Sequence, residues 1–287
     1  GGGKGGKRDH KALVKGQVVE EEERDLDVAG WRKVFPDHAA NVWTSLARMS
    51  DEVINYELMV AVIGHLAATG EADGAVLVFL PGLAEITRLY EDLTDPAAPR
   101  GLWVLPLHSN LSTEEQREVF KPPPPGQRKV VLATNIAETS ITIDDVTAVI
   151  DTCRMKENRW DAATGMSSLV EDWVSKASAR QRKGRAGRAR QGICYHMVTS
   201  RRFQKFLDYQ VPEMLRVPLD SLILQIKVLG VDDPQRFLCS AVQAPPALAV
   251  DASLALLRRL GALQQAANTD TLTPLGQHLA TLPVDVR

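Results

Sequence analysis

Residues 181–188 read QRKGRAGR, a stretch with four cations, two glycines and no carboxylate. The wider segment 175–190 carries seven Lys and Arg residues and no Asp or Glu, although the formal net charge of the whole chain is −2. Positive charge is therefore focused on one segment. Guanidinium groups three residues apart, with glycines between them, can converge on one small multivalent anion such as a nucleotide γ-phosphate. A solvated basic helix face or a localisation signal is the alternative interpretation.

A polar loop upstream strengthens the phosphate interpretation. Residues 133–144 read ATNIAETSITID and follow the apolar run 130–132. The loop and the basic segment resemble motifs V and VI of the DEAH/RHA group of superfamily 2 RNA helicases, in which motif VI reads Gln-Arg-x-Gly-Arg-x-Gly-Arg. The match to motif VI has no gaps. The two blocks together thus resemble the nucleotide-binding half of a helicase motor.

The resemblance covers the chain from about Val53 to its end. Three further blocks resemble parts of the same group, namely residues 76–82 (VLVFLPG, motif IV), 106–109 (PLHS, the strand end that follows) and 272–276 (LTPLG, the winged-helix signature). Residues 155–158, 167–171 and 216–219 most resemble the DExH branch that is linked to translation initiation and the small ribosomal subunit. The resemblance therefore implies both a fold and a cellular setting.

Hydrophobic periodicity supports the implied fold. Short apolar runs typical of strands recur at residues 75–80, 102–107, 129–133, 146–151 and 193–198. Segments of helical periodicity, such as 83–93 and 113–120, lie between them. Alternating β and α segments predict an α/β fold, in which helices cover both faces of a parallel sheet. The resemblance makes residues 51–205 the second RecA-like domain of a helicase.

The remaining segments differ in character. Residues 1–50 contain a Gly/Lys-rich start and an acidic run at 20–27, so we expect a flexible N-terminal segment or insertion. Residues 206–287 contain short helical segments, and the resemblance implies a small, mainly α winged-helix domain that buttresses the core. Residues 156–174 alternate polar and apolar side chains around a turn-rich centre and predict a β-hairpin. In the family such a hairpin wedges against nucleic acid; a plain surface hairpin is the alternative.

Composition limits the class of protein. A chain of 287 residues with 44% hydrophobic residues is long enough for two domains with cores of their own. The three cysteines are far apart and lack metal-ligand spacing, so neither a disulfide framework nor a zinc site is indicated. No apolar stretch approaches the ~20 residues needed to cross a bilayer, and no signal peptide is present. We expect an intracellular protein, cytoplasmic by default, with a nuclear or organellar location left open.

The resemblance assigns the catalytic residues. It implies that Gln181 positions the attacking water or touches the γ-phosphate. It implies that Arg185 and Arg188 are arginine fingers, which neutralise charge as the terminal phosphate departs and are worth ~10³ to 10⁵ in rate in other phosphoryl-transfer systems. Arg182 belongs to the same motif and joins the nucleotide-binding set, with an ion pair between motifs as the alternative role.

Three further residues complete the nucleotide-binding set. Asp144 matches the family residue that accepts hydrogen bonds from the ribose, although an Asp that merely forms a turn is a strong rival. Phe120 matches the aromatic residue that stacks on the base, and a core Phe at a helix end is its alternative. Ser140 lies in the loop that the family uses to relay the nucleotide state to the RNA path.

The resemblance also implies a path for single-stranded or structured RNA. Thr134 matches a contact to the RNA backbone, and Asn135, His108, Ser109 and Gly82 are assigned to the same path. Hydroxyls and backbone amides suit phosphate contacts that carry no sequence information. A histidine at a strand end is commonly structural, so His108 has that alternative.

Two expected motifs are not in this sequence. It contains no Asp-Glu-x-His, and Gly1, Gly6 and Lys7 imitate a Walker A loop in which Arg8 replaces the required Ser or Thr and no strand precedes the loop. Both motifs belong to the first RecA-like domain of such helicases. We therefore expect ATP hydrolysis only together with that domain, which would also supply the Mg²⁺ ligands. Expected partners are RNA, the first RecA-like domain and the small ribosomal subunit; a non-catalytic RNA- or ribosome-binding scaffold and a DNA helicase are the alternatives.

Overall fold

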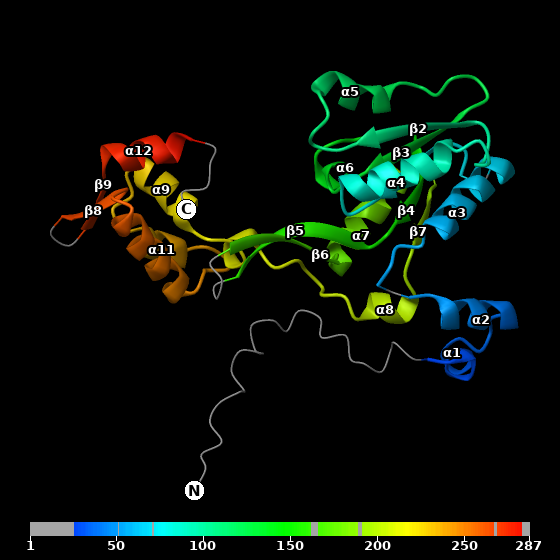
Figure 1. Ribbon diagram of the computed structural model, residues 1–287, viewed down its shortest axis with the longest axis horizontal. Coiled ribbons are helices and arrows are strands. Elements are labelled where there is room, and N and C mark those ends of the chain that lie inside the picture. The colour runs from blue at the N-terminus through cyan, green and yellow to red at the C-terminus, as the bar shows by residue number, and fades with distance from the viewer. Residues whose placement is uncertain are drawn as a thin grey trace, which may run out of the picture. The chain divides into compact units, whose positions relative to one another are not determined.

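Figure 1 shows the computed structural model of the chain, which describes residues 26–50, 52–70, 72–161, 166–188, 191–266 and 269–282. The chain divides into two compact units. The first unit contains the sequence up to Arg154 and Val174–Asp208, and the second contains Met155–Trp173 and the chain from Tyr209 onward. The residues of the predicted hairpin therefore group with the C-terminal part of the chain, which the sequence prediction did not anticipate.

A five-stranded sheet forms the centre of the first unit. Its order is β2-β3-β1-β4-β7, and the four pairings are parallel. The strand bounds, in that order, are Leu102–Leu107, Arg128–Ala133, Ala75–Phe79, Val146–Asp151 and Ile193–His196. The inner strands β1, β3 and β4 are buried along nearly their whole length, which explains their continuous apolar sequences. The predicted parallel α/β sheet is confirmed.

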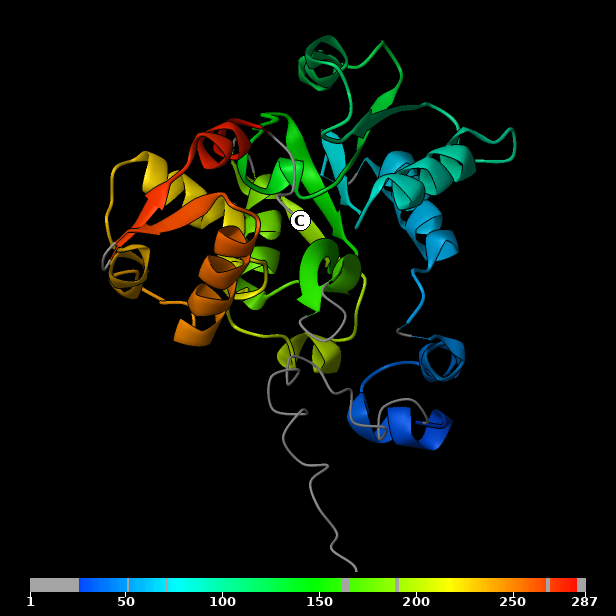
Figure 2. The ribbon, with the colours of Figure 1, turned by 60° about the vertical axis from the view of Figure 1, so that its left-hand side comes forward.

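One face of the sheet is covered by two helices. Val76, Val78 and Leu132 point toward this face and pack in one cluster with residues of α3 (Tyr56–Thr69) and α4 (Leu83–Thr94). Helices α3 and α4 lie side by side in both views (Figure 1, Figure 2). The cap of α3 is Gly70, whose φ of 64° lies in the left-handed region that favours glycine.

The opposite face is covered by the blocks that resemble motifs V and VI. Alternate residues such as Leu77 and Phe79 pack there against Ala137, Ala186 and Val119. These three belong to α6 (Ile136–Thr139), the 3₁₀ turn η3 (Gly184–Gly187) and the 3₁₀ turn η2 (Glu118–Phe120). The helices α5 (Thr113–Arg117), α7 (Lys176–Lys183) and α8 (Ser200–Gln204) complete the unit.

The N-terminal region corrects one expectation. We expected residues 1–50 to be flexible, but α1 (Val28–Val34) and α2 (Ala40–Arg48) form within them. Asp27 caps α1 by accepting a hydrogen bond from the backbone N–H of Gly30, and the indole of Trp43 donates to the carbonyl of Phe35 at 2.8 Å. Aromatic and capping side chains stabilise this pair, whereas the Gly/Lys-rich start and most of the acidic run lie outside the described residues.

The second unit begins with a strand pair, β5 (Arg154–Asp161) and β6 (Met166–Trp173), at the predicted hairpin. The backbone N–H of Trp160 donates to the carbonyl of Arg216, which ties β5 to the turn η4 (Glu213–Leu215). The other elements are α9 (Asp220–Val228), α10 (Pro234–Cys239), α11 (Ala247–Arg259), β8 (Leu263–Ala266), β9 (Thr269–Leu272) and α12 (Pro274–Thr281).

Three helices and an antiparallel strand pair share the core of this unit. Ile223, Leu238 and Leu257, from α9, α10 and α11, pack in one buried cluster with Leu263 of β8. Thr273 caps α12, and Pro274 occupies its first turn, as the sequence predicts. Helices followed by a two-stranded wing fit the winged-helix prediction. In the described part of both units, every helix is too short or too polar to cross a bilayer.

Candidate nucleotide and nucleic-acid site

Five predicted site residues follow the carboxyl ends of three neighbouring strands. The last residues of β1, β2 and β3 are in register, with Phe79 and Leu107 both aligned with Ala133. The loops after these strands are joined, because the backbone N–H of Thr134 donates to Leu107 and that of Leu80 to Ala133. The predicted RNA-path residues lie in these loops, namely Gly82, His108, Ser109, Thr134 and Asn135. One edge of the sheet thus gathers them, as expected for a ligand site in a parallel α/β fold.

The exposure of these residues separates their possible roles. Ser109 and Asn135 are exposed and Thr134 is half-buried, so their side chains can reach a ligand. Gly82 is buried as the cap of α4 and has only backbone groups to offer. His108 Nδ1 accepts a hydrogen bond from the backbone N–H of Asn110 at 3.2 Å. This contact supports the structural alternative for His108.

The two predicted arginine fingers lie against the same loop. Arg185 donates through Nη1 to the carbonyl of Ile141 at 3.2 Å and through Nη2 to the carbonyl of Glu138. Arg188 donates through Nη1 to Oγ1 of Thr142 at 2.7 Å. Within the described part of the chain, neither guanidinium pairs with a carboxylate. Burial and, next, the charge of Arg188 lower the pKa of Arg185 below its ordinary value, and the charge of Glu138 opposes part of this shift.

Arg182 points the other way, into the protein. It is 0% exposed, and its Nε donates to Oε2 of Glu138 at 3.0 Å while its Nη1 donates to Oδ1 of Asp151 at 2.8 Å. The guanidinium carbon also lies 4.9 Å from the ring centroid of Phe79. The assignment of Arg182 to the nucleotide-binding set is therefore corrected: it makes the ion pair between motifs that was its alternative role. Gln181, the residue before it, is exposed, and its side chain makes no hydrogen bond to a described residue.

Glu138 is a residue that sequence reasoning missed. Its carboxylate accepts hydrogen bonds from Arg182 and from Oγ of Ser178 at 2.5 Å, and its backbone carbonyl accepts from Arg185. Glu138 thus connects the loop of motif V with α7 and with a predicted finger. The sequence does offer one signal for this role: motif V contains the acidic Glu138, whereas the basic segment of motif VI contains no acidic residue.

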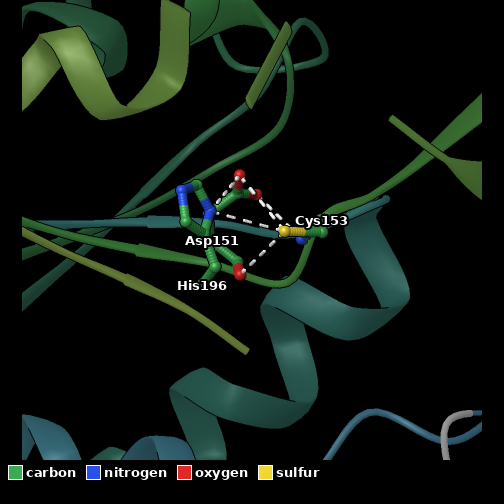
Figure 3. Close-up of side chains that lie close together, drawn as sticks. All are labelled: Asp151, Cys153 and His196. Atoms are coloured by element: carbon green, nitrogen blue, oxygen red, sulfur yellow. Dashed lines mark hydrogen bonds and ion pairs between the residues drawn. The ribbon is translucent and has the colours of Figure 1, made fainter. Parts of the chain in front are cut away.

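Asp151 is the second missed residue and closes β4. Burial opposes its ionisation, but the charge of Arg182, followed by hydrogen bonds from His196, Arg182 and the backbone of Cys153, lowers its pKa below the ordinary value. Figure 3 shows its carboxylate beside Cys153 and His196. His196 Nδ1 lies 3.4 Å from Oδ2 of Asp151 and 3.5 Å from Sγ of Cys153.

A carboxylate, a thiol and an imidazole are types of metal ligand, and in the described part of the chain these three form a compact group. Their environment does not fit a cation. Arg182 already neutralises Asp151, and a metal ion would face its guanidinium. Burial and the charge of Asp151 raise the pKa of Cys153 well above its ordinary value, so the thiol is held protonated. We therefore assign the group to the interior structure beneath Arg182.

The other predicted nucleotide residues lie on a different part of the same face. Phe120 ends η2 and is 53% exposed, and Asp144 and Ser140 are also exposed. The exposure of Phe120 argues against the core alternative. Lys129 links the segments of Phe120 and Asp144, because its Nζ donates to the carbonyls of Val119 and Lys121 and pairs with Asp145. Arg185 and Arg188 contact the loop between Glu138 and Thr142, and none of their hydrogen bonds to described residues reaches Phe120.

The parallel sheet, the loop-bound arginines and the winged helix define a RecA-like helicase motor domain. Comparison with protein families agrees: residues 56–190 match the model of the helicase conserved C-terminal domain, and residues 253–284 match the helicase associated domain (HA2), winged-helix. The chain belongs to the DEAH/RHA-type superfamily 2 helicases.

Several relatives are similar over most of this chain. The Arabidopsis thaliana DExH-box ATP-dependent RNA helicase DExH4, chloroplastic, is 47% identical over 270 residues, which are 92% of this chain and 19% of that protein. The human ATP-dependent RNA helicase DHX29 is 46% identical over 258 residues, covering 88% and 19%. The human ATP-dependent DNA/RNA helicase DHX36 is 41% identical over 285 residues, covering 96% and 28%.

Solved structures agree with the fold. The Escherichia coli DEAH/RHA helicase HrpB superposes with a TM-score of 0.69 at 34% identity, over 81% of this chain and 28% of that chain. This similarity confirms the predicted RecA-like architecture. The chain thus spans between a fifth and just over a quarter of the length of the curated relatives described above.

Proposed function

We propose that this chain is the C-terminal motor half of an ATP-dependent RNA helicase, in which Arg185 and Arg188 act as arginine fingers. One observation carries the proposal. Of three arginines in one motif, Arg182 is neutralised by two carboxylates, whereas Arg185 and Arg188 donate only to neutral oxygens of the loop 138–142. Two neighbouring guanidinium groups that pair with no carboxylate in the described part of the chain suit the triphosphate of ATP, whose negative charge they would balance.

The remaining site residues support the same reaction. Gln181 is exposed and uncommitted, so its amide can orient a water molecule for in-line attack on the γ-phosphate. The carboxylate of Glu138 is held by Arg182 and Ser178 and is not available to a metal ion. We therefore assign the Mg²⁺ ligands, together with the phosphate-binding loop, to the first RecA-like domain, which is the expected partner of this chain.

The loop 134–144 supports coupling between ATP and RNA. It begins with Thr134 and Asn135 at the edge proposed for RNA, and it holds Arg185 and Arg188 through residues 138–142. The exposed Ser140 lies between those ends. A movement of the loop on RNA binding would therefore change the position of both fingers, which is a direct route to RNA-stimulated ATPase.

The proposed partner and compartment follow from the chemistry of the RNA edge and from the resemblance of three segments to one branch of the family. The hydroxyls of Ser109 and Thr134, the amide of Asn135 and the backbone groups of Gly82 suit contacts to phosphate. We therefore propose single-stranded RNA without sequence preference as the substrate. The resemblance of residues 155–158, 167–171 and 216–219 to the branch linked to translation initiation makes the small ribosomal subunit our candidate partner, in the cytoplasm. The name of DExH4 shows that a chloroplast protein shares this domain.

The decisive experiment measures ATP hydrolysis in a protein that joins this chain to its first RecA-like domain. We expect Arg185→Ala to lower RNA-stimulated kcat by about 10³-fold, because a finger stabilises charge that develops in the transition state. RNA affinity should stay within about twofold, since Arg185 lies outside the proposed RNA edge.

Lys183→Ala is the matched control, because it removes an exposed cation from the same motif. Its turnover should stay close to that of the unaltered protein. Unchanged turnover in Arg185→Ala, or an unaltered protein that binds RNA without hydrolysing ATP, would favour the scaffold alternative.

A further inference from the structure

Lys129 is a buried lysine that the reaction scheme above does not use. It is the second residue of β3 and is 1% exposed. Its Nζ donates to the carbonyl of Val119 at 2.8 Å and to that of Lys121 at 3.0 Å, and it lies 2.8 Å from Oδ2 of Asp145. A buried ammonium group is costly unless its three protons all find acceptors, and here three acceptors surround it. The side chain is therefore held in one place.

The three acceptors lie beside the two residues assigned to the base and ribose of ATP. The carbonyls of Val119 and Lys121 flank Phe120 on η2, and Asp145 follows Asp144 directly. Phe120 and Asp144 are both exposed, so side-chain burial does little to hold them. Their separation depends on the segments that carry them, and Lys129 ties the backbone on either side of Phe120 and the side chain of Asp145 to one strand of the sheet.

We propose that Lys129 is a positioning residue that sets the separation of Phe120 and Asp144 and so preorganises the base- and ribose-binding part of the nucleotide site. This inference rests on the proposed function. Lys129 itself does not touch the nucleotide, because the three acceptors surround its ammonium group inside the protein. A site that is fixed before binding avoids the cost of ordering its loops around the ligand.

The neighbouring Arg128 provides a structural comparison. Its Nε donates to the carbonyl of Gly74 at 3.0 Å and its Nη2 to that of Ala72 at 2.5 Å. Like Lys129, it joins β3 to backbone carbonyls of a distant segment. The carbonyls that it binds belong to Leu66, Ala72 and Gly74 and not to η2, so loss of Arg128 should weaken the fold while Lys129 keeps its three contacts beside Phe120 and Asp144.

The test compares two ligands in the protein that joins this chain to its first RecA-like domain. ADP carries a base and a ribose, whereas inorganic tripolyphosphate carries neither. For Lys129→Met we expect ADP affinity to fall about tenfold, a loss within the range of one stacking contact. Tripolyphosphate affinity, measured by the same calorimetric titration, should stay within about twofold. An equal loss for both ligands, or no loss for either, would overturn the proposal.

Two controls separate positioning from general loss of structure. Arg128→Met should lower the melting temperature and leave the ratio of ADP to tripolyphosphate affinity unchanged. In a Phe120→Ala background, Lys129→Met should cause a clearly smaller further loss of ADP affinity than in the unaltered protein, because one of the two side chains that it positions is gone. Additive losses in this double mutant contradict the mechanism.

If Lys129→Met does not fold, Asp145→Asn replaces it. This variant keeps the lysine and its carbonyl acceptors but removes the ion pair at a half-exposed carboxylate. ADP affinity should fall about twofold to threefold, again without a change for tripolyphosphate, and an unchanged ratio overturns the proposal. ADP binding needs no catalysis. Normal ligand ratios with an Arg185-dependent ATPase would therefore reject only the role of Lys129, whereas the expected ratios without any ATPase would reject only the proposed function.

Discussion

Glu138 and Arg182 form a buried ion pair in which Nε and Oε2 lie 3.0 Å apart and the two side chains are 12% and 1% exposed. The backbone carbonyl of the same Glu138 accepts a hydrogen bond from Arg185. One residue of motif V therefore anchors motif VI through its side chain and orients a proposed finger through its backbone. A structural arginine and a proposed arginine finger of one motif thus both contact this glutamate.

Glu138→Ala should destabilise the fold. Arg182 would keep Asp151 but lose its second carboxylate inside the protein, and breaking a buried pair costs about 3 kcal/mol. Urea unfolding followed by circular dichroism measures the loss. Asp208→Ala, which removes the exposed partner of Lys176, is the control and should have a far smaller effect. Similar losses in the two variants would contradict the bracing role of Glu138.

Gln181→Ala should separate catalysis from stability. The side chain is exposed and makes no hydrogen bond to a described residue, so the melting temperature should not change. If the amide orients the attacking water, kcat should fall by about 10²-fold. Arg182→Lys is the contrasting variant: its loss of the paired donor geometry should lower stability and activity together. A Gln181→Ala protein with full turnover would remove Gln181 from the mechanism.

Asp151 makes stability depend on acid pH. Its pKa is lowered in the folded state, so the stability that it contributes is present above the unfolded carboxyl pKa of ~3.9 and is lost as pH falls through the folded value. The free energy of unfolding should decline below about pH 4. In Asp151→Asn this decline should be shallower, on a lower plateau at neutral pH, and parallel curves for the two proteins would argue against this source of acid sensitivity.

Thr134→Ala should weaken RNA binding equally for unrelated single-stranded sequences. A hydroxyl that contacts phosphate carries no base information, and the loss of one hydrogen bond to a charged group is worth about tenfold in affinity. Fluorescence anisotropy with two oligonucleotides of different sequence tests this. Thr94→Ala is the control. It removes an exposed hydroxyl from the C-terminal end of α4, whereas Gly82 of the proposed RNA edge caps the N-terminal end of this helix, so RNA affinity should not change. Loss for one sequence alone would indicate base recognition.

The sheet could be predicted from the sequence to within about two residues at the strand ends. The run 75–79 is continuous and apolar because this inner strand is covered on both faces, whereas the edge strand 102–107 is half-buried along most of its length. The predicted helix 113–120 was wrong in part: α5 ends at Arg117 and η2 follows it. This difference does not change the packing of the segment, because Val119 is still buried in the core.

The site was predicted less completely. Arg185, which is half-buried, and Arg188, which is exposed, belong to a motif that can be recognised in sequence. Glu138, Asp151 and Lys129 act through partners that lie far away along the chain or through backbone carbonyls, and neither leaves a local pattern. Helices α1 and α2 were missed because the composition of the preceding residues dominated the interpretation of the whole N-terminal segment.

The two-sided burial of the strands has a consequence for how this domain can vary. Val78 faces α3 and α4, whereas its neighbour Phe79 lies beneath Arg182 on the side of motifs V and VI. A methyl group gained or lost at Val78 should change the melting temperature, whereas a comparable change at Phe79 should also shift Arg182 and, through Glu138, the proposed finger Arg185. Two neighbouring positions of one strand would then allow the thermal stability of the domain and the rate of the proposed ATPase to vary separately.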